Sequence, residues 1–178
     1  MIDGIKPEDI NEYEQKLEAI RNSVVENVSG SDYDKAKQIH DALVDELEYD
    51  KTLSRIHTHD IYGALVEKCV VCEGYAKSYK YLLDGVGIPC VLVSGKGTNS
   101  KGETEEHIWN YVCLDNKWYA VDVTWDDPIV TGGALTNRIK HKYFLKGAPE
   151  FNSNHMANNY LSNNSFRFEY PKLSNEDY

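Results

Sequence analysis

The sequence predicts an α+β fold, in which helices come first and mostly antiparallel strands follow. Residues 7–28 and 32–47 repeat apolar side chains at helical spacing. After residue 88 the pattern changes to short runs rich in β-branched and aromatic residues, separated by turn residues. Helices and strands do not alternate along the chain, which argues against a parallel βαβ sheet. The 178 residues suffice for one domain with a sizeable core.

The first half of the chain is predicted to be helical. The first helix covers residues 7–28, and a break follows at Ser29-Gly30-Ser31. Either Ser31 or Asp32 can cap the second helix. Residues 50–60 are expected to be irregular, and residues 61–66 to form a short helical turn. The apolar faces consist of Ile10, Tyr13, Leu17, Ile20 and Val24 in the first helix, and Ala36, Ile39, Leu43 and Leu47 in the second.

A third helix is predicted to begin at Cys72 and to end at Gly85 and Gly87, and the sheet follows it. Asp115-Asn116 is predicted to join two of the strands as a tight turn. The tail from Asn152 to Tyr178 is weakly patterned and is expected to pack on the surface. In order, we expect a strand at 88–95, a polar loop at 96–106, strands at 107–114 and 117–125, a loop at 126–133 and an edge strand at 142–145.

Charge and hydropathy restrict the partners. The formal net charge is −10, which argues against nucleic acid or an anionic membrane surface as the main partner. No stretch approaches the roughly 20 apolar residues of a membrane span, so we expect no membrane insertion. The N-terminus lacks the features of a signal peptide. The chain is therefore expected to be soluble. It is also compatible with a domain of an exported or cell-surface protein whose signal peptide is absent from this chain, and its compartment and oligomeric state stay open.

Three of the four cysteines lie between residues 68 and 90, which raises three hypotheses. A redox Cys-x-x-Cys pair usually follows a strand within a βαβ unit, whereas Cys69 and Cys72 follow a segment that is predicted to be helical. A structural zinc site needs four ligands, commonly as two close pairs, and the nearby His57 and His59 do not have the usual spacing of a second pair. The third hypothesis is a single nucleophile.

Cys72 is the candidate for that nucleophile. It lies at the predicted start of a helix, where free N–H groups and the helix dipole stabilise a thiolate. Cys90 and Cys113 fit buried, inert thiols better, because they lie in predicted strands.

A thiolate nucleophile needs a base, and the base needs a group that orients it. If Asp115-Asn116 is a two-residue turn, Leu114 faces Lys117 in the next strand, and Asp122 comes opposite Trp109. His107 is two residues from Trp109, so His107 and Asp122 point to the same face of the sheet. The remaining histidines lack such a partner in the sequence. We expect His40 to lie on the surface or in packing, His57 and His59 to lie in irregular chain without a placed carboxylate, and His141 and His155 to be solvated.

With these residues in hand, the chain resembles the transglutaminase-like superfamily, a papain-related cysteine acyl-transfer fold. The segments that carry the resemblance are VCEGYAKSYKYLLDGVGIPC, HIWNYV and WYAVDVTWDDP. They occur in the family order of Cys, His and Asp, and the match spans roughly residues 32–150. The resemblance implies a nucleophile at a helix N-terminus packed on an antiparallel sheet, with Cys72 as nucleophile, His107 as general base and acid, and Asp122 as the residue that orients His107.

The resemblance also implies the reaction. The thiolate would attack a protein or peptide amide and form a thioester, which water would hydrolyse or a lysine amine would convert to a crosslink. We favour hydrolysis, because water needs no second binding site. The alternative is a catalytically inactive transglutaminase-like module that serves as a scaffold or binding domain. No metal or cofactor is expected, since the sequence lacks a calcium loop of the Asp-x-Asp-x-Asp-Gly type.

The surroundings of the site are predicted less directly. The backbone N–H of Cys72 is expected to donate to the oxyanion, with Tyr49 or Tyr62 as the second donor. Trp109 and Trp125 are candidates for the walls of the substrate cleft. The polar loop before His107 is expected to be mobile and to form an acidic lip that favours basic substrates, with Glu103, Glu105 and Glu106 as its charges.

The sequence suggests a single domain over residues 1–178. Within it we expect an N-terminal helical arm at 1–31, a catalytic core at 32–150 and a C-terminal extension at 151–178.

Overall fold

The computed structural model describes residues 7–127, 140–158 and 169–178. Two long helices open the chain, α1 (Pro7–Asn27) and α2 (Asp32–Glu46). Ser31 caps α2: its side chain accepts from the backbone N–H of Asp34, whose carboxylate in turn accepts from the N–H of Ser31. Both predicted helices are therefore confirmed, with Ser31 rather than Asp32 as the cap.

The third helix, α3 (Cys72–Gly85), is preceded by a small parallel pairing. Strand β1 (Glu48–Tyr49) pairs with β2 (Cys69–Val70), which places Tyr49 beside Val70 and close to the start of α3. The connection between them is irregular, as expected, until the π-helical turn η1 (Gly63–Glu67). Lys68 ends this turn in the left-handed region, at φ 61°.

Over the described residues, the main sheet contains four antiparallel strands in the order β5-β4-β3-β6. Its members are β3 (Cys90–Thr98), β4 (Thr104–Leu114), β5 (Lys117–Val121) and β6 (His155–Ala157). Asp115 and Asn116 join β4 to β5 with φ values of 51° and 62°, which is a two-residue turn of the kind that suits a twisted hairpin. The predicted pairing of Leu114 with Lys117 is confirmed.

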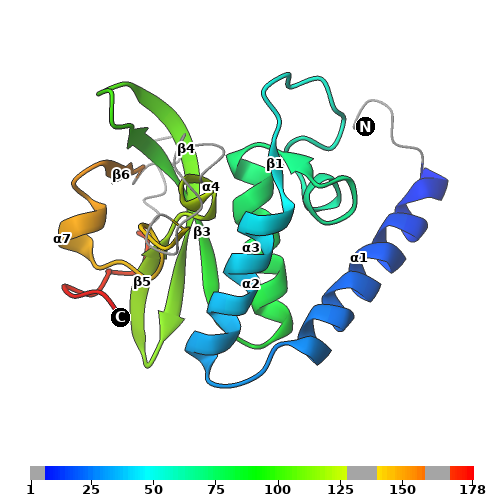
Figure 1. The fold of residues 1–178 in the computed structure, drawn as a ribbon, viewed down its shortest axis with the longest axis horizontal. Helices are drawn as coiled ribbons and strands as arrows, with labels where there is room; N and C mark the ends of the chain where they lie inside the picture. The colour runs from blue at the N-terminus through cyan, green and yellow to red at the C-terminus, as the bar shows by residue number, and fades with distance from the viewer. Residues whose placement is uncertain (1–6, 128–139, 159–168) are drawn as a thin grey trace.

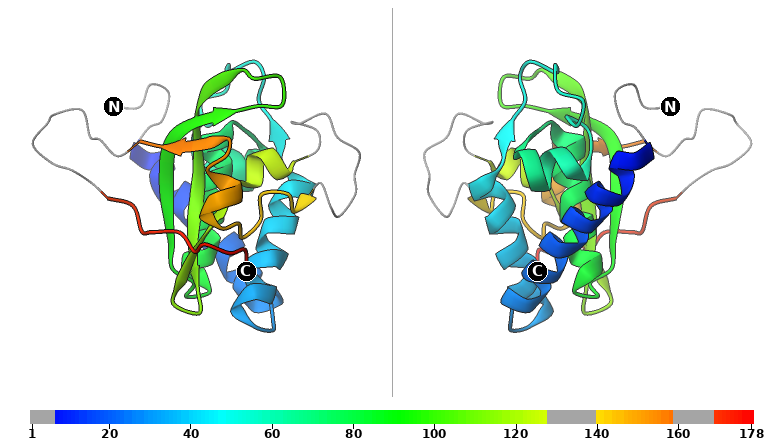
Figure 2. Two further views of the ribbon diagram at one scale, coloured as in Figure 1. Left: turned by 90° about the vertical axis from the view of Figure 1, so that its left-hand side faces the viewer. Right: turned by 90° about the vertical axis from the view of Figure 1, so that its right-hand side faces the viewer.

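Hydrophobic clusters cover both faces of this sheet. Figure 1 shows α1, α2 and α3 on one side of it, and α3 packs directly on β3 and β4. On the other face, Trp109, Tyr111 and Phe151 form a second cluster with the short helix α7 (Ala148–Phe151). Figure 2 shows α1 crossing α3 in one view and the C-terminal segment running along the sheet in the other. Leu173 in that segment forms an isolated bridge with Trp118, so residues 169–178 pack on the surface as expected of the tail, whereas residues 155–157 of the tail form a strand of the sheet.

Three strand predictions were wrong. The predicted loop at 96–106 is mostly strand, because β3 continues to Thr98 and β4 begins at Thr104. The strand predicted to reach Trp125 ends at Val121, where Asp122 caps a short helix α4 (Val123–Asp126). The predicted edge strand at 142–145 is turn and bend, and Leu145 there has a φ of 51°. The fourth strand is instead β6, which pairs with β3. The loop predicted at 126–133 lies mostly outside the described residues.

Glycines explain why the polar segment 95–98 is a strand. A Cβ at Gly95 would lie 2.2 Å from the backbone oxygen of Met156 in β6. A Cβ at Gly97 would lie 2.8 Å from the indole of Trp125. Both positions therefore need glycine because other chain segments occupy the space. A run of glycine and charged residues, which reads as a loop in the sequence, here marks close packing.

Candidate active site

His107 and Asp122 meet on one face of the sheet. His107 lies in β4 and Asp122 directly follows β5, and Nε2 of His107 is 2.7 Å from Oδ2 of Asp122. The side chains are 3% and 0% exposed, so this pair is shielded from water. The predicted shared face is therefore observed, because the tight turn and the alternation of side chains along both strands set it.

The end of β5 fixes the carboxylate of Asp122. As the N-cap of α4, Asp122 accepts from the backbone N–H of Trp125 through Oδ1, at 3.1 Å. Its other oxygen, Oδ2, faces His107. Burial alone would raise the pKa of Asp122, but the charge of His107 and hydrogen bonds from His107 and His155 hold it well below its usual range. Asp122 is therefore ionised at neutral pH.

The interactions that lower the pKa of Asp122 raise the pKa of His107. Burial lowers its pKa, but the charge of Asp122 and the hydrogen bond to it more than offset this, and a hydrogen bond with Cys72 adds to the rise. The net effect raises the pKa of His107 to about 10. Since Nε2 faces Asp122, the Nδ1 atom is left for the thiol.

Cys72 is the first residue of α3, with Val71 as the N-cap. Its N-terminal position places the thiol at the positive end of the helix dipole. Gly74 lets the first turn pack closely, because a Cβ there would lie 2.4 Å from the side chain of Val70. Within the described residues all four cysteines are free, and Cys72 and Cys69 are half-buried. Cys90 is buried, which raises its pKa to about 12.

Tyr49 is the tyrosine that lies at Cys72. Burial and the nearby charges of Cys72 and Glu105 raise the pKa of Tyr49 to about 12, while a hydrogen bond with the backbone of Cys72 acts in the opposite direction. Its hydroxyl is therefore protonated at neutral pH. Tyr62 lies elsewhere, because its ring packs against Tyr13 in α1 at a centroid distance of 4.1 Å.

The two tryptophans occupy different positions. Trp125 stacks on the ring of His107, with centroids 4.9 Å apart and an interplanar angle of 24°. It also lines a cleft of about 710 Å³. Trp109 is 1% exposed, its ring centroid lies 6.1 Å from that of His107, and it does not line that cleft.

The cleft beside Trp125 has mixed charge. Glu105 lines it together with Lys101 and Lys142, so the acidic lip expected from the sequence is offset there. Glu106 lies outside the set of lining residues and faces Lys96, with Nζ and Oε1 3.8 Å apart. The other lining residues are Thr98, Asn99, Ser100, Trp125, Tyr143, Ser153 and Asn154.

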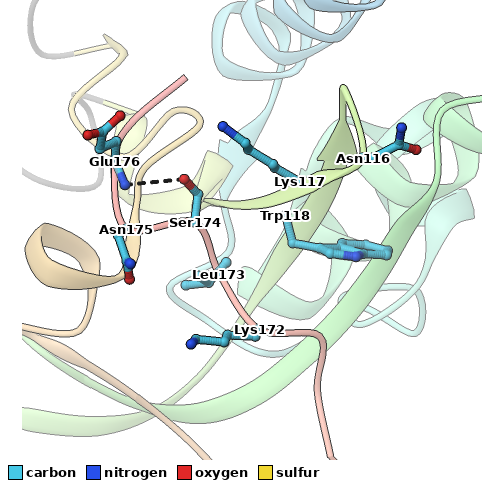
Figure 3. Close-up of a pocket in the computed structure, with 8 residues that line it drawn as sticks. All are labelled: Asn116, Lys117, Trp118, Lys172, Leu173, Ser174, Asn175 and Glu176. Carbon is cyan, nitrogen blue, oxygen red and sulfur yellow. Dashed lines mark hydrogen bonds between the residues drawn. The ribbon is translucent and has the colours of Figure 1, made fainter.

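A second hollow, of about 420 Å³, lies at the opposite end of the β4–β5 hairpin. Figure 3 shows it between the turn residues and the C-terminal segment, where Ser174 accepts a hydrogen bond from the backbone of Glu176. None of its lining residues contacts His107, whereas the larger cleft includes Trp125, which stacks on that ring, so we do not place the site in this second hollow. Its lining residues are Asn116, Lys117, Trp118, Lys172, Leu173, Ser174, Asn175 and Glu176.

Four histidines differ from their sequence-based predictions, and one of them is His59, whose Nδ1 lies 3.1 Å from Oε2 of Glu73. His155 is buried rather than solvated, and its Nε2 lies 3.0 Å from Oδ2 of Asp122. His141 is not simply solvated either, because its Nε2 lies 2.6 Å from Asp41. His57 has a carboxylate after all, with Nδ1 2.8 Å from Asp60. The sequence around His155 has no periodicity, so only the pairing of β6 with β3 reveals its position.

His40 is buried in packing, which was one of the two alternatives. Its Nε2 lies 3.1 Å from Oδ2 of Asp126, and this contact ties α2 to α4 just beyond Asp122. Among the described residues, two groups of side chains have ligand atoms close enough together to hold a metal ion, His107-Asp122-His155 and His40-Asp41-His141. The distances of 2.6–3.0 Å within these groups are those of hydrogen bonds, which account for the contacts, so we assign no metal to them.

A thiol at a helix N-terminus, facing an imidazole and carboxylate on an antiparallel sheet, defines the class of papain-related cysteine acyl-transfer folds. The chain belongs to the transglutaminase-like superfamily, whose sequence model matches residues 11–123. The resemblance seen in the sequence is thereby confirmed, and with it the α+β fold. This superfamily includes cysteine peptidases and transglutaminases.

Individual relatives agree with this family. Kyphoscoliosis peptidase from Mus musculus is 27% identical over 142 residues, and the human protein of that name is 30% identical over 98 residues. These matches cover 72% and 49% of this chain, but only 21% and 15% of the relatives. The chain thus spans about a fifth of their length. A solved transglutaminase structure (TGase) superposes with a TM-score of 0.55 at 19% identity, covering 76% of this chain and 36% of the other.

No helix within the described residues is both long and apolar enough to span a membrane.

Proposed function

We propose that this chain is a cysteine-dependent amide hydrolase or acyltransferase that acts on protein or peptide amides through Cys72, His107 and Asp122. The observation that best supports the proposal is the buried 2.7 Å contact between His107 and Asp122, at the thiol that begins α3. A surface histidine would not need a dedicated buried carboxylate that is itself held by a helix N-terminus.

The reaction would proceed in two halves. Sγ of Cys72 attacks the carbonyl carbon of the amide, and the C–N bond breaks as Nδ1–H of His107 gives its proton to the departing amine. The acyl group remains on Cys72 as a thioester. His107 then takes a proton from water, the resulting hydroxide displaces the thiolate, and a carboxylic acid is released. A lysine amine in place of water would give a crosslinking amide bond.

Tyr49 is proposed as the second oxyanion donor, beside the backbone N–H of Cys72. Its raised pKa keeps the hydroxyl protonated, and its oxygen accepts a hydrogen bond from the backbone N–H of Cys72, so the two donors lie together where the oxyanion would form. The pairing of β1 with β2 holds Tyr49 in this position. The extended acyl chain would lie along Trp125 into the neighbouring cleft.

Hydrolysis remains favoured over crosslinking, since water needs no second binding site. To test this, a mixed peptide pool is incubated with the protein, with and without an added primary amine, and analysed by mass spectrometry. Cleavage or deamidation without amine incorporation supports hydrolysis, whereas incorporated amine supports transamidation. Absence of turnover in the wild type, together with an unreactive Cys72, would favour the inactive scaffold.

Asp122→Asn supplies the matched variant. Its side-chain oxygen can still accept from the N–H of Trp125, so α4 should keep its cap. Its NH₂ group cannot accept from Nε2–H of His107, and we expect turnover to fall about 10³–10⁴-fold in a protein that still folds but unfolds at a lower temperature, because the buried carboxylate no longer pairs with His107. Cys72→Ala should abolish turnover. Full activity of the Asp122→Asn variant would remove Asp122 from the mechanism.

A further inference from the structure

A second histidine faces the carboxylate of Asp122. Nε2 of His155 lies 3.0 Å from Oδ2 of Asp122, the same oxygen that lies 2.7 Å from Nε2 of His107. The side chains of His155 and Asp122 are both 0% exposed. An unprotonated imidazole nitrogen there would direct its lone pair at a carboxylate oxygen, so each Nε2 must carry a proton.

We propose that His155 is a positioning residue for the acyl-transfer site. It shares Oδ2 of Asp122 with His107, and it thereby sets both the direction and the strength of the hydrogen bond between Asp122 and His107. This inference rests on the proposed function. It extends the site from three side chains to four and takes the fourth from the part of the chain beyond the family match, which ends at residue 123.

The fold holds His155 in one orientation. Strand β6 pairs with β3, so that His155 is opposite Gly97. The ring stacks on Phe151 with centroids 4.0 Å apart and an interplanar angle of 18°, and the indoles of Trp125 and Trp109 lie 4.6 and 5.0 Å away. This aromatic enclosure shields the ring from water, and Asp122 is the partner that the described part of the chain offers to its Nε2.

The other nitrogen of His155 has a partner that fixes the ring from its opposite side. Nδ1 is 2.9 Å from Oδ1 of Asn154, and Nδ2 of the same carboxamide donates to the hydroxyl of Tyr143 at 3.0 Å. The carboxamide, itself held by Tyr143, therefore orients the imidazole so that Nε2 points at Asp122.

A shared carboxylate is a weaker partner for each imidazole. Oδ2 of Asp122 divides its hydrogen bonding between two N–H groups, so it stabilises the imidazolium of His107 less than an unshared oxygen would. The other ionisable or charged groups around the three residues are Cys72 on α3, Tyr49 on β1, Asp126 on α4, Glu105 on β4, and Lys142, which lies over the Tyr143 ring. None of them changes when His155 is replaced.

The test compares His155→Phe with His155→Gln. Phenylalanine keeps an aromatic ring in the enclosure but removes the donor, whereas the side-chain NH₂ of glutamine can replace Nε2–H. The readout is the rate of Cys72 alkylation by iodoacetamide against pH, measured by site-resolved mass spectrometry. In His155→Phe the upper inflection, where the His107 imidazolium loses its proton, should move up by about half a pH unit or more. The His155→Gln profile should stay close to the wild type.

Three results would overturn the inference: an unchanged profile in His155→Phe, a shift to lower pH, or equal shifts in both variants, which would indicate packing alone. If His155→Phe fails to fold, Asn154→Leu replaces it. That variant removes the carboxamide that orients the His155 ring and should shift the inflection upward by a smaller amount, and an unchanged profile there counts against the inference.

The alkylation assay separates this inference from the proposed function, because it needs no amide substrate. A shifted inflection in a protein that turns over no amide would leave the role of His155 intact and defeat the proposed function. Amide turnover with an unshifted His155→Phe profile would do the reverse.

Discussion

His107 has a different partner on each ring nitrogen, and this division sets its chemistry. The Nε2 side faces a buried carboxylate, while the hydrogen bond with Cys72 leaves Nδ1 to exchange a proton with the thiol. Because Asp122 stays ionised, its charge stabilises the imidazolium that forms when Cys72 loses its proton. A thiolate–imidazolium pair is the state in which a cysteine attacks an amide.

At this residue scale, the four thiols should differ in reactivity. We expect Cys72 to react fastest with iodoacetamide at mildly acidic pH, because of His107 and the N-terminus of α3. Cys90 should react slowest, since burial raises its pKa to about 12, and burial also raises the pKa of Cys69. Site-resolved labelling of the reduced protein measures the order. Cys72 in last place would contradict the proposed nucleophile, and Cys72→Ala provides the background for the other three sites.

Removal of the Tyr49 hydroxyl should affect turnover without affecting thiol reactivity. An oxyanion forms during attack on an amide but not during alkylation, so Tyr49→Phe should lower kcat about 10²-fold and leave the Cys72 alkylation rate near the wild-type value. Tyr62→Phe is the matched control, because Tyr62 packs against Tyr13 rather than at Cys72. Equal losses in both variants, or none in Tyr49→Phe, would exclude Tyr49 as the donor.

At the scale of elements, the central strand β3 holds the site together. It pairs with β4, which carries His107, on one side and with β6, which carries His155, on the other. Gly97 lies between them and leaves room for the indole of Trp125. The stacked contact of Trp125 with His107 thus depends on a missing side chain in the neighbouring strand.

Gly97→Ala should disturb this packing. The new Cβ would lie 2.8 Å from the indole of Trp125 and 3.4 Å from Cδ2 of His107, so the indole must move. We expect a loss of about 1–3 kcal/mol in the free energy of unfolding and a slower alkylation of Cys72. Lys96→Ala is the control, since Lys96 is exposed on the same strand and its ion pair contributes little. A Gly97→Ala protein as stable and reactive as the control would show that the space is not needed.

For the whole molecule, the raised pKa of His107 couples folding to pH. The folded state holds a proton on His107 up to about pH 10, whereas the unfolded chain releases it near 6.5. The stabilisation is therefore complete below pH 6.5 and is lost as the pH rises from 6.5 to 10. A shift of this size corresponds to on the order of 3–5 kcal/mol.

This prediction is checked by urea unfolding of the wild type and His107→Gln between pH 6 and 10. The free energy of unfolding of the wild type should fall over this range by a few kcal/mol more than that of the variant, in which this proton is absent. Other groups titrate in both proteins, so only the difference between them reports on His107. Parallel curves would show that His107 is not protonated in the folded state at neutral pH.

The division of the chain into an arm at 1–31, a core at 32–150 and an extension at 151–178 stays a prediction. The short strand β6 nevertheless joins the main sheet from within the extension. A chain that ends before residue 155 would lack both the edge strand β6 and the hydrogen bond from His155 to Asp122.

The sequence by itself determined the local part of the site. A helix that begins at Cys72, and a hairpin whose two-residue turn puts His107 and Asp122 on one face, follow from short-range periodicity and turn chemistry. Within these segments the end of β5 was predicted wrongly. The alternation of Val-Asp-Val-Thr-Trp continues a strand pattern, but Asp122 ends the strand because its side chain caps the helix α4.

Only the tertiary structure decided the neighbours of that local unit. Tyr49 reaches Cys72 through the pairing of β1 with β2, and His155 reaches Asp122 across 33 residues through the pairing of β6 with β3. Both strands are two or three residues long, too short to show a periodicity of their own. Their positions depend on which strand, far away in the sequence, has an unpaired edge, and on which glycines leave space beside that edge. Neither property can be predicted from the residues of the short strands themselves.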